Sequence, residues 1–508
     1  MKKSFLITLL LLSLTGCTDN TTSIAVAEET LTPINNEEIV ADKNHEQIPA
    51  PINSEGAPPA GEHSQMSIGE GVPPAREHSQ MPISEGVPPA GEHGQIPPPM
   101  KSSLTVQEAN AIEQQLLNEV TYIAKPDGYP VVDTNQTIFY SNNAIIEAPQ
   151  KGDPFYGQDA TYIINSPSYT NNEDGTIADN VTGLMWQQDP GEKMTWPEAV
   201  ENLKKINKEG FLGYYDWRIP SMKELYSLVD FSGLTRRSSS TSIPYIDTDY
   251  FVFAYGDQAG EPRFIDSQIL SSTIYDATTM ADNTTVFGVN FADGRIKGYG
   301  IDKNFYCYYV RGNTAYGQNL FTDNGDETIT DEATNLMWSK NDSGFYKAGT
   351  LEDGTLDWEE ALDWVQEMNS QNFLGYSDWR LPNIKELHSI VDYTKSPKTT
   401  NSPAINELFT CTPTINAFNQ DDFGYYWSST THDDTAASPT EYNAASYMVF
   451  GNAMGVMGNE TVDAHGAGSQ KSDPKVGNRE NYPAPDIMAP QGDEQRVYNI
   501  VRLVRSTS

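Results

Sequence analysis

The sequence is poor in cysteine and in basic residues. Three cysteines stand among 508 residues, and 32 Lys and Arg face 70 Asp and Glu, which gives a formal net charge of −38. Proteins that bind nucleic acid carry basic patches for the phosphates, so this balance argues against a nucleic-acid partner. It argues equally against electrostatic adsorption to anionic lipid.

The sequence also lacks the short motifs of common catalytic sites. It contains no nucleophile elbow, no His-Glu-x-x-His metal motif, no phosphate-binding loop and no repeated set of Cys and His ligands. Only three of the seven histidines lie beyond residue 100, namely His388, His432 and His465. We therefore predict no catalytic residue and no required cofactor, and we expect a protein that is not an enzyme.

The N-terminus has no apolar run long enough to stay in a bilayer. Phe5 to Leu14 is a short apolar stretch that follows two lysines, which is typical of a signal peptide over residues 1–16. It ends in Leu-Thr-Gly-Cys17, which resembles a bacterial lipobox and implies a lipid on Cys17; the alternative is an ordinary cleaved signal. Thr18 follows where an inner-membrane retention Asp would stand, which favours the outer membrane, on its periplasmic face or at the cell surface.

Residues 17–100 have a composition that cannot build a core. They are rich in Pro, Glu, Gly, Ser and Gln, and a repeat of about 15 residues starts at 54, 69 and 84. We predict a disordered Pro-rich stalk, so the lipid would be the only contact with the membrane. Residues 101–156 follow as a connecting segment with one amphipathic helix inside 104–123.

One passage of the chain is written twice. The first copy has GTIADNVTGLMW, TWPEAV and FLGYYDWRIPSMKEL, and the second has ETITDEATNLMW, LDWEEAL and FLGYSDWRLPNIKEL, in the same order. This predicts two folded modules, 157–312 and 313–508. Cys307 and Cys411 fall at non-matching positions of these modules, which leaves two free thiols or one bridge between modules open.

Each module predicts a hairpin and two helices. A turn-rich acidic segment leads into Leu-Met-Trp, which reads as a hairpin that enters a core strand. Both helices of each module begin with capping-box spacing, at Thr195, Ser221, Asp357 and Asn383. Between them lies the corner Asp-Trp-Arg-hydrophobic-Pro, where Arg218 and Arg380 are interpreted as structural, each paired with an acidic neighbour.

These motifs resemble the Lcl C-terminal domain family. The resemblance implies an α+β fold, two tandem C-type-lectin-like modules with two helices packed on antiparallel sheets. The family's founding member is an adhesin of Legionella, which implies binding of surface glycans. Two departures matter: the stalk is not a collagen Gly-X-Y repeat, and both modules are acidic, which argues against sulfated polyanions.

Ligand specificity is predicted where the two copies differ. The second module has an insertion at about 451–496 that gathers His465, Lys471, Asp473, Lys475 and Asp493, and its Trp427 has no Trp counterpart in the first module. Long loops of this kind often carry function. We expect these residues to bind a glycan or an envelope polymer, and the alternative is a scaffold that binds an envelope protein. The sequence does not set the oligomeric state.

Calcium is a separate hypothesis. Asn172, Asp174 and Asp179 match Asn324, Asp326 and Asp331, and oxygen ligands at alternate positions suit a hard cation. Asn, Asp and Gly in a hairpin turn explain the same residues equally well, and both interpretations stay open.

Overall fold

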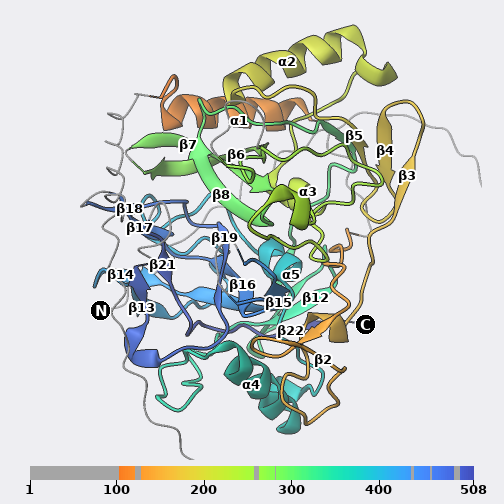
Figure 1. The fold of residues 1–508 in the computed structure, drawn as a ribbon. Helices are drawn as coiled ribbons and strands as arrows, with labels where there is room; N and C mark the ends of the chain where they lie inside the picture. Colours follow the sequence, from red (N-terminus) through yellow and green to blue (C-terminus); the bar gives the residue numbers. More distant parts are fainter. Residues whose placement is uncertain are drawn as a thin grey trace, which may run out of the picture. The chain divides into compact units, whose positions relative to one another are not determined.

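The computed structural model describes residues 102–120, 128–256, 263–280, 282–435, 440–457, 460–485 and 492–507, which all belong to the unit Pro88–Ser508. They form an α+β fold of antiparallel sheets with few helices, which confirms the predicted class (Figure 1). The signal peptide, Cys17 and the stalk lie outside the described residues. No helix of the described part has the length and apolar character to cross a membrane.

Each module contains the same four-stranded antiparallel sheet. In the first module the order is β3 (Tyr169–Asn171), β4 (Thr176–Asp179), β5 (Leu184–Gln187) and β9 (Val310–Gly312). In the second it is β10 (Phe321–Asp323), β11 (Thr328–Asp331), β12 (Leu336–Ser339) and β22 (Val504–Ser506). The closing strand of each module therefore pairs with its Leu-Met-Trp strand, which is the predicted core strand.

The four predicted helix starts are confirmed. Capping boxes open α2 (Trp196–Glu209), α3 (Met222–Tyr226), α4 (Trp358–Ser370) and α5 (Ile384–Ser389). Trp196 and Trp358 are fully buried, because the box fixes where the helix begins and the first residue then faces the core. Short 3-10 turns follow α2 and α4, at Phe211–Gly213 and Phe373–Gly375.

The repeated corner is a structural device. Arg218 pairs with Glu224, and Arg380 pairs with Glu386, both largely shielded from solvent, which confirms the structural interpretation of these arginines. The aspartates of the corner pair instead with the arginines of the closing strands, Arg311 and Arg505. The Arg311 Nε atom lies 2.7 Å from Asp216, and the matching distance from Arg505 to Asp378 is 2.8 Å.

The two modules share a six-stranded antiparallel sheet. Its order is β15 (Tyr425–His432), β16 (Ala444–Val449), β19 (Gln470–Pro474), β8 (Arg295–Gly300), β7 (Asn283–Asn290) and β6 (Gln268–Thr279) (Figure 1). The junction is the pairing of β19 with β8, at Gln470 and Ile296. The two modules contribute their equivalent strands in reverse order, so β19 pairs with its own counterpart, β8. The modules are therefore related by a local pseudo-twofold axis at this junction.

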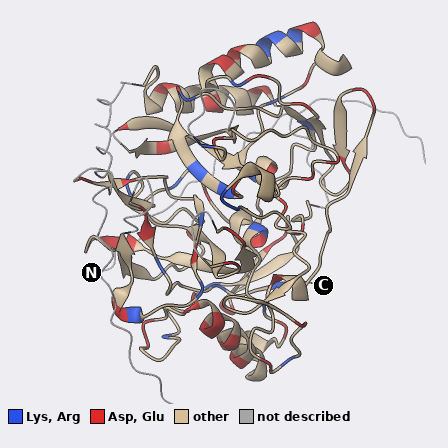
Figure 2. Cartoon of the chain, in the orientation of Figure 1, with Lys and Arg blue, Asp and Glu red and all other residues tan. Residues whose placement is uncertain are grey.

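Charged side chains reinforce the junction. Arg236 of the first module holds Asp433 of the second with two hydrogen bonds of 2.8 Å, and Arg295 lies 2.5 Å from Asp434. Figure 2 shows blue, basic segments along β8, in a chain whose formal net charge is −38. Buried Lys385 of α5 donates to the Ser227 and Asp133 carbonyls. Each basic group thus balances acceptors that belong to another part of the chain.

The connecting segment is a strap across both modules. It comprises residues 102–120, with α1 (Val106–Glu119), and 128–165, with β1 (Phe139–Tyr140), β2 (Ile145–Ile146) and a 3-10 turn (Asp159–Thr161). The predicted helix is therefore confirmed. Glu113 accepts a hydrogen bond from the Ile274 N–H in β6, and Gln136 accepts one from the equivalent Thr431 N–H in β15. The register of β6 and of β15 shifts near Ile274 and Thr431, which leaves their main-chain N–H groups without a partner in the sheet. The side chains of the strap accept hydrogen bonds from these N–H groups.

Glu113 leads to a prediction about how folding stability depends on pH. In the second module the uncharged Gln136 accepts the equivalent hydrogen bond, so the comparison isolates the effect of an ionisable group. Burial raises the pKa of Glu113 to about 7. Between its unfolded pKa of about 4.5 and this value the folded state binds more protons, so folding stability falls as pH rises through that window. We expect Glu113→Gln to stabilise the chain by about 1–2 kcal/mol at pH 8, and to change little at pH 4.5.

Urea unfolding at both pH values measures this difference against the parent chain. Asp159, whose pKa burial also raises to about 7, contributes equally to both proteins and cancels. A variant that is no more stable than the parent at pH 8 would contradict the assignment.

The predicted insertion at 451–496 needs a correction. Residues 470–474 form β19, the counterpart of β8, so they are part of the repeated sheet. The added pieces are the hairpin β17 (Met454–Met457) and β18 (Glu460–Asp463), and the stretch with β20 (Ala484–Pro485) and β21 (Glu494–Gln495). The remaining short elements are β13 (Pro413–Ile415), β14 (Asp421–Phe423) and 3-10 turns at Ser239–Thr241 and Arg479–Asn481.

Candidate binding cleft

Trp427 is a core residue, and the prediction that it binds a ligand is wrong. Its side chain is 0% exposed, its ring packs edge-on to Tyr447, and its Nε1 donates to the Leu356 carbonyl at 3.0 Å. The equivalent position of the first module holds Leu270, which is also fully buried. The two copies therefore fill the same core position with side chains of different size.

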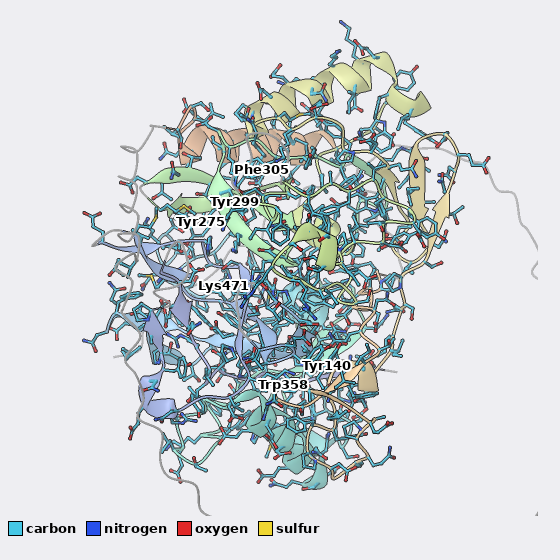
Figure 3. All side chains as sticks on the ribbon, in the orientation of Figure 1. Tyr140, Tyr275, Tyr299, Phe305, Trp358 and Lys471 are labelled. Atoms are coloured by element: carbon cyan, nitrogen blue, oxygen red, sulfur yellow. The ribbon has the colours of Figure 1, made fainter. Side chains whose placement is uncertain are left out.

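Three of the predicted loop residues do come together, but inside the protein. His465 lies 3.4 Å from Asp493, and Lys471 lies 3.6 Å from the same carboxylate (Figure 3 labels Lys471). His465 is 1% exposed, and burial lowers its pKa. Lys297 of the first module contributes further positive charge to Asp493. The group forms part of the junction between modules, so the surface site predicted here is not present.

Asp473 and Lys475 are structural as well. Asp473 accepts hydrogen bonds from the Tyr447 hydroxyl and the Arg496 N–H. Lys475 is fully buried, donates to the Ser141 carbonyl, and lies 4.1 Å from the ring of Trp358 (labelled in Figure 3). Each polar group is thus committed to a neighbour within the fold, which explains why the sequence cluster does not form one site.

The calcium candidates separate into turns and strand ends. Asp174 accepts from the Thr176 N–H and hydroxyl, and Asn172 donates to the same hydroxyl; the second module repeats these bonds with Asp326, Asn324 and Thr328. Asp179 and Asp331 lie at the other ends of β4 and β11, about 10 Å along the strand. The described residues contain no group of three or more His, Cys, Asp or Glu that would hold a metal ion. Turn chemistry accounts for the hydrogen bonds of Asn172, Asp174, Asn324 and Asp326, and calcium binding stays a prediction.

Among the described residues, Cys307 and the three histidines are buried, and Cys411 is partly buried. Cys307 and Cys411 are free thiols, and burial raises the pKa of both. Burial also lowers the pKa of His432 to about 3, and His388 hydrogen-bonds the Tyr393 hydroxyl at 2.9 Å. Of the two interpretations of the cysteines, free thiols are therefore the correct one.

A cleft of about 980 Å³ opens beside the corner of the first module. Leu116, Leu117 and Val120 at the end of α1 line one wall, and Leu203 of α2 lines another. Its size is that of a typical small-ligand site. Because α1 belongs to the strap, this cleft exists only when the strap is packed on the module.

Tyr215 presents an aromatic face to this cleft. Its side chain is 69% exposed, whereas Trp217, two positions further along the corner, is buried. The ring rests on Gly210, which ends α2 in the left-handed conformation with φ 74°, and a Cβ there would lie 2.5 Å from the ring. Only glycine permits this contact, so Gly210 supports the exposed ring. Asp216 beside it is bound to Arg311 and remains largely exposed.

The second module differs at these positions. Asn372 and Ser377 replace Gly210 and Tyr215, and the ring of Tyr162 from the strap lies 5.9 Å from the Arg380 guanidinium. In the first module Arg218 lines the cleft instead. Our sequence reasoning missed this site, although the signal was visible: the passages FLGYYDWR and FLGYSDWR differ at one position, and that position carries the exposed ring.

Comparison with known proteins gives one match. The model of the Lcl C-terminal domain matches residues 175–311 and 327–465, more than half of the chain. Searches among curated proteins and among solved structures found no match. The two matched ranges contain the duplicated hairpin, helices and corner. The chain therefore belongs to the Lcl C-terminal domain family and carries two copies of that domain.

Proposed function

We propose that this protein is a binding protein of the bacterial cell envelope, tethered by a lipid on Cys17, that recognises a glycan or an envelope polymer without turning it over. The observation that carries the proposal is the cleft of the first module, with exposed Tyr215 held on Gly210. Family membership supports a role at the surface. The lipobox and the signal peptide support the location, which we place at the outer membrane.

The chemistry of the cleft favours an uncharged or weakly charged sugar. An exposed aromatic face stacks on the apolar face of a sugar ring, and the largely exposed Asp216 carboxylate accepts hydrogen bonds from hydroxyl groups. The net charge of −38 disfavours polyanionic chains. The apolar wall formed by α1 favours a protein side chain instead, which keeps a protein partner as the second candidate.

Tyr215→Ala tests the proposal. We expect glycan binding of the full-length chain to weaken about five- to thirtyfold, because a stacking contact contributes about 1–2 kcal/mol. A glycan array identifies the ligand, and calorimetric titration measures its affinity. Folding stability should change by less than about 0.5 kcal/mol, since the side chain is exposed.

Ser377→Ala, at the equivalent position of the second module, is the matched control and should bind as the parent does. If no glycan binds, and a protein captured by the parent chain is lost from the Tyr215 variant, the scaffold alternative is correct. If binding survives in the Tyr215 variant, the cleft is not the site.

A further inference from the structure

Lys223 of α3 meets a side-chain amide at the beginning of the second module. Its Nζ donates to Asn319 Oδ1 at 2.5 Å, and Asn319 Nδ2 donates to Asp331 Oδ2 at 2.7 Å. Only one orientation of the amide satisfies both neighbours, because Lys223 cannot accept and a carboxylate cannot donate. Gly317 permits this approach, since a Cβ there would lie 2.9 Å from the Lys223 Cβ. Lysine, amide and carboxylate therefore stand in a row.

The surroundings favour an uncharged amine. Burial lowers the pKa of Lys223 to about 8, so about one-tenth of it is neutral at pH 7. Lys223 lines a small pocket with Tyr129 and Tyr226, whose buried hydroxyl groups have no hydrogen-bond partner. A desolvated lysine of this kind is a nucleophile, and a free hydroxyl is a donor for negative charge that develops on an attacked carbonyl.

We propose that Lys223 and Asn319 form an intramolecular isopeptide bond, with Asp331 as the proton carrier, which covalently joins the first module to the second. The neutral Nζ attacks Cγ of Asn319 and a new N–C bond forms. Asp331 accepts the proton that the nitrogen loses and delivers it to Nδ2. The Cγ–Nδ2 bond then breaks and ammonia leaves, so the reaction needs neither an oxidant nor a reductant.

The surroundings of Lys385, at the equivalent position of the second module, show which side chains the reaction requires. Lys385 is the equivalent lysine, and burial lowers its pKa to about 8 as well. It donates to two main-chain carbonyls, and the position equivalent to Asn319 is Pro167, which has no side-chain amide. Asp179, the counterpart of Asp331, has a buried Oδ2 atom without a partner. The pseudo-twofold axis therefore gives two lysines and two carboxylates, but only one amide that can react.

Mass spectrometry of the purified full-length chain after trypsin digestion tests the bond. We expect peptides 219–236 and 312–340 to be joined, with no cleavage after Lys223 and with a mass about 17 Da below their sum, the mass of the ammonia that nucleophilic attack releases. Lys223→Arg should abolish the joined peptide, because the guanidinium stays protonated. Lys385→Arg is the matched control and should retain it.

Asp331→Asn removes the carboxylate that carries the proton but keeps a side chain of similar size beside Asn319. We expect the joined peptide to be lost or to form at least tenfold more slowly in variant protein that circular dichroism shows to be folded. Equal formation in this variant would overturn the role of Asp331. A folded parent chain that is cleaved after Lys223, and that yields peptides 219–223, 224–236 and 312–340 separately at unchanged mass, would overturn the bond itself, and this result does not depend on any variant.

Discussion

Replacing Arg295 with methionine is expected to destabilise the folded chain by about 3–5 kcal/mol. Arg295 is 8% exposed and lies between Asp434 of the second module and Asp293 of its own module. Its Nη2 also donates to Ser472 in β19 at 2.7 Å. Removal of the guanidinium takes a countercharge from two buried carboxylates, at 2% and 4% exposure, and leaves Asp434 without its ion-pair partner. The cost of a buried uncompensated charge exceeds the value of the pair itself.

Urea unfolding followed by circular dichroism measures this loss. Arg263→Met is the matched control, because Arg263 pairs with Asp266 at 3.1 Å but is about half exposed, and we expect a change of at most about 1 kcal/mol. Adding Asp434→Asn to the Arg295 variant should restore part of the loss, since it removes one of the stranded charges. A loss no larger than that of the Arg263 variant would mean that the junction does not depend on this charge.

Trp427→Ala is the second large effect that we expect, with a loss of about 3–5 kcal/mol. The indole is fully buried within the second module, and its removal opens a cavity and leaves the Leu356 carbonyl without its donor. Protein that remains folded should bind ligand as the parent does, because Trp427 does not line the cleft of the first module.

Leu270→Ala makes the equivalent deletion in the first module, and we expect about 2–4 kcal/mol there because the side chain is smaller. Trp427→Ala should therefore lower folding stability and leave binding unchanged, whereas Tyr215→Ala should weaken binding and leave folding stability nearly unchanged. A Trp427 variant of unchanged stability and impaired binding would restore the original prediction for this residue and contradict its burial.

If the proposed lipid on Cys17 tethers the protein, a pulling force reaches the folded modules through the strap. The strap precedes both modules in the chain and packs on β6 and β15. The cleft uses the end of α1 as a wall, so its shape depends on the strap being in place. An isopeptide bond between Lys223 and Asn319 would hold the modules together even if the strap were displaced, since it lies downstream of the strap in the chain.

The sequence by itself determined what is local and repeated. The duplication predicted two modules of one α+β family, and the spacing of cap and carboxylate predicted four helix starts, because a capping box lies within four residues. Arg218 and Arg380 could be assigned to structure for the same reason, since their partners are six residues away.

Only the tertiary structure decided which side chains face the core and which face a ligand. Trp427 and Tyr215 are both aromatic residues that one copy lacks, and nothing local separates them; the pairing of β15 with β16 buries one, and the contact with Gly210 exposes the other. The pairing of β8 with β19 and the meeting of Lys223 with Asn319 join residues that are distant in the chain, the latter 96 positions apart. Such contacts depend on register and on the packing of whole modules, which a local pattern does not encode.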